Sequence, residues 1–135
     1  MASGQGRHDH PWTLSTPGGR TPYQAWRAPD LDPPALVVQA GQTRLHYALR
    51  AIEDLHAMLK AHGDWMPLGG TDEQKTPPEG SVEAWARAAG NPVGGWYGLK
   101  KGLRGRFAVY VPPVLELLGL AELETRPRNN SMRAL

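Results

Sequence analysis

The stretch SVEAWARAAGNPVGGWYGLKKGLRGR, residues 81–106, carries the strongest pattern in the chain and decides the predicted fold. It holds five lysines and arginines against one glutamate, a net charge of +4, whereas the whole chain of 135 residues has a net charge of +2. Trp96 and Tyr97 lie within it. Cations neutralise phosphates and aromatic rings stack on bases, so the stretch is typical of a nucleic-acid-binding surface.

Length and composition favour one domain in a reducing compartment. A chain of 135 residues buries a core without covalent cross-links. The sequence has no cysteine, which excludes disulfides, thiolate zinc sites and cysteine nucleophiles. The N-terminus lacks the apolar run of a signal peptide, and no apolar stretch is long enough to cross a bilayer. We therefore expect a cytoplasmic protein with no membrane contact.

Glycine and proline divide the chain into three predicted parts. Residues 1–34 are expected to be an extended arm, because they hold six prolines and no repeating apolar period. Residues 35–125 are expected to form a single helical, winged-helix-like domain, and residues 126–135 a basic tail. Aromatic residues in a polar arm often dock onto a folded surface, of the same chain or of a partner. The alternative is an unstructured leader in which the three rings have no role. The aromatic residues of the arm are Trp12, Tyr23 and Trp26.

The clearest predicted element is a helix over residues 43–62. Apolar residues recur there at steps of three and four, and charged residues such as Arg44 occupy the opposite face. Gly63 follows as a C-cap. Residues 35–40 are compatible with a helical turn or with a short strand.

Two short helices are predicted within the basic stretch. Ser81 caps the first, over 82–89, and the second covers 93–104, although its four glycines also allow a loop. A loop there would let successive backbone amides form a nest for an anion. Strands are predicted at 107–111 and 120–124, with a helical turn after Pro113.

Residues 82–103 resemble the helix-turn-helix pattern of DNA-binding regulators. Ala86, Gly90, Val93, Trp96 and Leu99 fall at the intervals of that pattern. The resemblance implies a mainly α fold, a small helix-turn-helix or winged-helix-like domain with a short β-hairpin. It also implies that the second helix enters the DNA major groove, and that the protein is a homodimer.

The resemblance assigns roles to the cations. Lys100, Lys101 and Arg106 would position the protein on phosphates, and the forked guanidinium of Arg104 would contact a base. The alternative is a solvated basic face that only keeps the protein in solution. DNA is expected in preference to RNA. The predicted nucleic-acid-binding residues are Arg87, Tyr97, Lys100, Lys101, Arg104 and Arg106.

The sequence predicts neither an enzyme nor a cofactor. His8 and His10 flank Asp9 in the arm, which is typical of an adventitious metal binder. His46 and His56 are ten residues apart and do not share a helix face. The alternative function is an interaction or assembly protein that docks on a larger complex through Trp12, Tyr23 and Trp26 of the arm, because tryptophan is favoured at binding hot spots.

Overall fold

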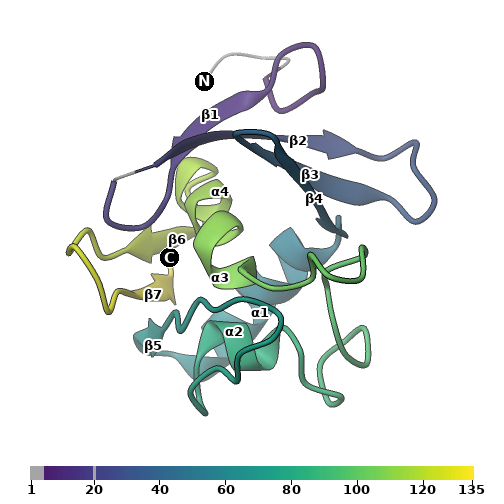
Figure 1. Cartoon of the computed structure of the whole chain (residues 1–135). Coiled ribbons are helices and arrows are strands. Elements are labelled where there is room, and N and C mark those ends of the chain that lie inside the picture. Colours follow the sequence, from purple (N-terminus) through teal and green to yellow (C-terminus); the bar gives the residue numbers. More distant parts are fainter. Residues whose placement is uncertain (1–4, 20) are drawn as a thin grey trace.

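The computed structural model describes residues 5–19 and 21–135 as two antiparallel sheets with helices packed between them (Figure 1). The larger sheet has four strands in the order β1-β2-β3-β4, and the smaller has three in the order β5-β7-β6. Figure 1 shows the helices on one face of the larger sheet, while the loop before β1 lies beyond its other face. The elements are β1 (Trp12–Ser15), β2 (Pro22–Ala28), β3 (Ala35–Ala40), β4 (Thr43–Ala48), α1 (Ala51–His62), β5 (Met66–Pro67), α2 (Val82–Trp85), α3 (Phe107–Tyr110), α4 (Pro112–Leu117), β6 (Ala121–Leu123) and β7 (Ser131–Ala134).

The predicted fold class is wrong. The described residues are 27% strand and 20% helix, so the fold is not mainly α. The β-rich half comes from residues 12–48, where β1 to β4 form an antiparallel meander joined by short turns. A sheet of this kind buries one face and leaves the other open, which requires alternation of apolar and polar residues rather than a helical period.

Strand β4 shows why the prediction of one helix over 43–62 was partly wrong. Leu45 and Tyr47 are buried, whereas Arg44 and His46, which alternate with them along the strand, point to the other face of the sheet. This two-residue period runs directly into the helical period of α1, and the join at residues 49–50 contains neither glycine nor proline. The C-terminal part of the prediction is confirmed, because α1 ends at His62 with Gly63 in a left-handed cap conformation.

The segment expected to be an extended arm supplies β1 and β2. Its strand β2 pairs with β3 over five residue pairs, from Gln24 opposite Gln39 to Ala28 opposite Ala35. Trp12 and Tyr23 are buried in the main core, so these rings dock on their own fold. At the other end, the segment expected to be a basic tail contains β7, which pairs with both β5 and β6.

Of four further local predictions, three are confirmed and one is wrong. The strand alternative at residues 35–40 is confirmed as β3, and 120–124 contains the predicted strand as β6. The helical turn after Pro113 is confirmed within α4. The strand predicted at 107–111 is wrong, because residues 107–110 form α3, whose buried face includes Phe107 and Tyr110.

An aromatic cluster joins the larger sheet to the helices. Tyr47 meets Phe107 edge-on with ring centroids 5.7 Å apart, and Trp85 stacks on Tyr97 at 5.1 Å. The Tyr47 hydroxyl donates to the carbonyl of Gly105 at 2.7 Å, which satisfies its buried polar end. The sheet, the loop before α3 and the helices therefore share one core.

The free side of β4 is partly covered by the loop after residue 96. Ala48 donates its N–H to the carbonyl of Tyr97 at 2.8 Å, and Leu99 donates to the carbonyl of His46 at 2.8 Å. Gly98 lies between these two bonds, opposite Tyr47. A side chain at this position would collide with the backbone of Arg104, so only glycine allows the loop to lie against the strand.

Removal of residues 1–31 should unfold the protein rather than release a domain. The truncation deletes β1 and β2, uncovers the buried residues Leu36 and Val38, and leaves a two-stranded hairpin, which is marginally stable in water. We expect the truncated chain to lose the cooperative urea transition of the full chain, measured by circular dichroism. A truncated chain that still unfolds cooperatively would contradict this role for β1 and β2.

Candidate nucleic-acid interface

The second helix of the predicted helix-turn-helix does not form. Residues 93–104 are turns and irregular backbone, and α2 ends at Trp85 after four residues. Asn91 organises this region, since its side-chain oxygen accepts from the N–H groups of Val93 and Gly95 at 3.0 and 3.2 Å. Its side-chain N–H group donates to the carbonyl of Trp85 at 2.7 Å. An asparagine that bonds to local backbone in this way favours a turn over a helix.

Glu83 is fully buried and connects α2 to α3. One carboxylate oxygen accepts from the backbone N–H of Ala108 in α3 at 2.9 Å, and the other accepts from the guanidinium of Arg87 at 3.1 Å. Burial raises the pKa of Glu83, while these two donors oppose the increase. The first turn of α2 is thereby bound to the beginning of α3.

The guanidinium group of Arg87 donates hydrogen bonds to several groups within the protein. Besides Glu83, it donates to the carbonyls of Thr71 and Asp72, both at 2.9 Å, and to that of Lys75 at 2.8 Å. Its side chain is 11% exposed. Arg87 therefore holds the loop 71–75 in place and does not project toward solvent as predicted.

The same loop neutralises two more of the predicted cations. Glu73 bonds to the guanidinium of Arg104 at 3.0 Å and accepts from the backbone N–H groups of Gly102 and Arg104 at 3.0 and 2.8 Å. Asp72 forms an ion pair with Arg106. The anion nest that a loop conformation would create is thus present, and the carboxylate of Glu73 fills it. We call residues 71–75 with Arg87, Arg104 and Arg106 the acidic clasp.

Trp96 packs against the arginines of the acidic clasp, and Tyr97 is buried in the core. The guanidinium carbons of Arg87 and Arg104 lie 4.6 and 4.4 Å from the ring centroid of Trp96, so the indole packs against two cations. Tyr97 is fully buried and donates its hydroxyl to Asp54 of α1 at 2.8 Å. Of the six predicted nucleic-acid-binding residues, Lys100 and Lys101 remain as exposed cations without a carboxylate partner among the described residues.

Lys100 and Lys101 lie beside the side chains of Arg44 and His46 on β4. The backbone bond from Leu99 to His46 places them at this strand, and His46 and Arg44 point to the outer face of the sheet. Partial burial, followed by the charges of Lys100 and Arg44, lowers the pKa of His46. Within the described part of the chain, none of these residues forms an ion pair with a carboxylate. We call Arg44, His46, Lys100 and Lys101 the cationic edge.

An aromatic residue of the predicted partner-binding set lies next to the cationic edge. Trp26 occupies the outer face of the sheet, in a small cluster with Ala35 and Val37 that is separate from the main core. The guanidinium carbon of Arg44 lies 5.3 Å from the Trp26 ring centroid. The imidazole of His8 lies 5.1 Å from the same ring, tilted by 45°.

The other two predicted partner-binding residues are internal. Trp12 is 3% exposed, with the guanidinium of Arg27 placed 4.9 Å from its ring centroid. Tyr23 is equally buried and donates its hydroxyl to the carbonyl of Tyr110 at 2.8 Å. Neither ring is exposed to contact a partner.

Sequence reasoning missed the residues that organise this site, for identifiable reasons. Arg44 and His46 were assigned to a helix, although alternation along TRLHYA is the signal of a half-buried strand. Glu83 lies four residues before Arg87, a spacing that indicates an ion pair within a helix. The approach of Asp72 and Glu73 to the arginines depends on the path of a long loop, and nothing local in the sequence specifies it.

No group of three or more histidine, aspartate or glutamate side chains among residues 5–19 and 21–135 could hold a metal ion. No helix in this same part of the chain is long and apolar enough to span a bilayer.

The fold and this surface define a small protein of mixed α and β structure with one cationic sheet edge and an internally neutralised basic segment. Residues 4–135 match the model of DUF6855, described as a family of unknown function, and the chain belongs to that family. Neither a curated protein nor a solved structure shows a significant match to the chain.

Replacement of Glu83 should destabilise the protein strongly. Glu83→Gln leaves the largely buried guanidinium of Arg87 without a counter-charge, and loss of one partner of a buried pair costs about 3 kcal/mol. The measurement is the free energy of unfolding in urea. The matched control is Glu122→Gln, which breaks the exposed pair with Arg133 and should cost less than about 1 kcal/mol. Equal losses in the two variants would contradict the central role of Glu83.

The acidic clasp should weaken in acid. Bonds from the side chain and backbone of Arg104 lower the pKa of Glu73 to about 2, below its ordinary value of 4.5. Ionised Glu73 therefore stabilises the fold fully above pH 4.5, and this contribution disappears as the pH falls toward 2. We expect Glu73→Gln to be less stable than the unchanged protein at neutral pH, with the difference shrinking through this range in urea titrations. A difference independent of pH would contradict this account.

Proposed function

We propose that this protein is a small, non-enzymatic nucleic-acid-binding protein of the cytoplasm that contacts phosphates through the cationic edge. The observation that carries the proposal is the gathering of Arg44, Lys100 and Lys101 beside one strand, without an acidic partner among the described residues. Unpaired cations on one surface attract a polyanion, because their binding releases counterions from the phosphates.

The contrast with the acidic clasp supports this choice of surface. Arg87, Arg104 and Arg106 are paired with carboxylates of the chain itself, and a phosphate would have to displace Glu83, Glu73 or Asp72 to reach them. Displacement would also break the backbone bonds that the clasp makes. The cationic edge offers its charges without such a cost.

The rival proposal, an assembly protein that docks through the aromatic arm, has less support. Two of the three aromatic residues on which it rests, Trp12 and Tyr23, are buried in the core. The predicted homodimer stays a prediction. The absence of cysteine supports a reducing compartment and hence the cytoplasm.

The proposal predicts salt-dependent binding that requires the cationic edge. We expect the triple variant Arg44→Ala, Lys100→Ala, Lys101→Ala to bind a fluorescent oligonucleotide at least tenfold more weakly at about 50 mM salt. Its plot of log affinity against log salt should be shallower, because fewer counterions are released. Fluorescence anisotropy, with single-stranded and duplex probes, measures both quantities.

The control removes exposed cations elsewhere. Lys60 lies on α1 and Lys75 lies in the loop 71–75, and both are exposed. The variant Lys60→Ala, Lys75→Ala should bind almost as well as the unchanged protein. Failure of the unchanged protein to bind either probe at low salt, or equal losses in the two variants, would overturn the proposal.

A further inference from the structure

The shape of the surface beside the cationic edge restricts the form of nucleic acid it can bind. Four strands spaced about 4.8 Å apart make a face about 14 Å wide, broader than the major groove of B-DNA, which is about 12 Å wide. The outer face carries no described helix that could enter the groove instead, because α1 to α4 pack on the other side (Figure 1). A flat face suits a single strand, whose bases are free to lie on it.

Trp26 is the aromatic platform on that face. Its neighbours in the same row across the sheet are Val37 and His46, so the indole lies one strand away from β4 and beside its cations. Arg44 already packs against the ring. A nucleotide whose base stacks on Trp26 would place its phosphates near the cationic edge. Base stacking and phosphate attraction are the two interactions that sequence-tolerant single-strand binding uses.

The ring is covered by a group that resembles a base in shape. Trp26 is only 6% exposed, and the imidazole of His8 is among the planar groups that cover it. His8 itself is exposed, and its side chain makes no hydrogen bond to a described residue. A rotation of this one side chain would therefore uncover the part of the indole that the imidazole covers, at little cost, while Arg44 stays packed against the ring.

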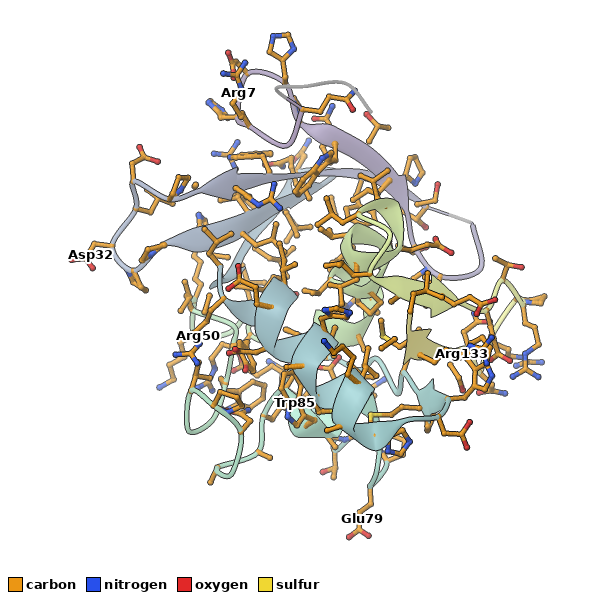
Figure 2. All side chains as sticks on the ribbon, turned by 180° about the vertical axis from the view of Figure 1, so that it is seen from behind. Arg7, Asp32, Arg50, Glu79, Trp85 and Arg133 are labelled. Carbon is orange, nitrogen blue, oxygen red and sulfur yellow. The ribbon has the colours of Figure 1, made fainter. Side chains whose placement is uncertain are left out.

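The loop that carries His8 is anchored without it. Gly6 accepts from the backbone N–H of Arg27 at 2.8 Å, and the N–H of Gly6 donates to the carbonyl of His10 at 2.7 Å. Figure 2 shows Arg7, in the same loop, beyond the sheet on the side opposite α1. Residues 5–8 and residues 26–30 line a groove of about 420 Å³. His8 thus has space beside it, while the loop stays attached to β2.

We propose that the outer face of the sheet binds single-stranded nucleic acid by stacking one unpaired base on Trp26, in the place that the imidazole of His8 occupies. This inference rests on the proposed function and specifies its ligand. His8 acts as a removable cover: it shields the indole in the free protein and competes with the incoming base. The cationic edge then holds the neighbouring phosphates.

Trp26→Leu tests the platform. Leucine preserves the small apolar cluster with Ala35 and Val37 but removes the flat ring. We expect its affinity for a short oligothymidylate and a short oligouridylate to fall about tenfold, with loss of the tryptophan quenching that accompanies binding. Its affinity for a duplex of the same length should change less than twofold. The two single strands distinguish DNA from RNA as the source of the base.

The chain offers a matched control in Trp65. The guanidinium carbon of Arg133 lies 4.7 Å from its ring centroid, as Arg44 does near Trp26, but Arg133 is paired with Glu122. Trp65→Leu therefore removes an arginine-packed tryptophan from a neutralised surface. It should leave the affinity for single strands unchanged.

His8→Ala tests the cover and does not endanger the fold, because His8 is exposed. Removal of the imidazole should raise the affinity for single strands about twofold to tenfold, the range expected for loss of one competing aromatic contact. The duplex affinity should stay the same. This result distinguishes a histidine that competes with the base from one that contacts the nucleic acid, because removal of a contacting histidine would weaken binding.

The outcomes separate the two proposals. Tighter or equal binding of the duplex in a salt-dependent manner would overturn the single-strand inference and leave the proposed function standing. Unchanged single-strand affinity in Trp26→Leu, or unchanged or weakened affinity in His8→Ala, would also overturn it. Absence of binding to any probe at low salt would overturn both.

Discussion

The buried carboxylate of Glu83 is the constraint on which the rest of the structure depends. It binds the N–H of Ala108 and the guanidinium of Arg87, and Arg87 in turn fixes four carbonyls of the loop 71–75. A buried charge is costly unless donors surround it, so these bonds form together or not at all. Two short helices and a long loop, none of them stable alone, are held in one arrangement.

This constraint determines which charges of the molecule face the solvent. Once Arg87 holds the loop, Asp72 and Glu73 lie within reach of Arg106 and Arg104, and the basic segment is neutralised by the chain itself. The cations at residues 100 and 101 lie beyond the reach of the acidic clasp and next to β4. Most cations of the basic segment 81–106 therefore form ion pairs within the protein, and the unpaired positive charge lies beside the sheet.

The sequence predicted local elements better than their assembly. The end of α1 at His62, the helical turn after Pro113 and the strand at 120–124 follow from caps, proline and short apolar runs. The join between β4 and α1 was missed because Leu45, Leu49 and Ile52 satisfy a helical spacing by coincidence while Leu45 and Tyr47 satisfy the strand spacing. The acidic clasp was beyond prediction because it joins residues 12 to 34 positions apart, and loop paths are not encoded in local patterns. The basic stretch correctly drew attention to Lys100 and Lys101 as exposed cations. The other two members of the cationic edge, Arg44 and His46, lie outside that stretch, on β4.

The pairing of Gly98 with Tyr47 bears on how the protein behaves at high concentration. The end strand of an open sheet exposes N–H and C=O groups that can recruit the same strand of another molecule, which begins aggregation. Here the loop after Trp96 occupies that position along the second half of β4, and the charge of Arg44 repels a second copy from the first half. The β4 edge of the sheet is thus protected against pairing with the same edge of a second molecule.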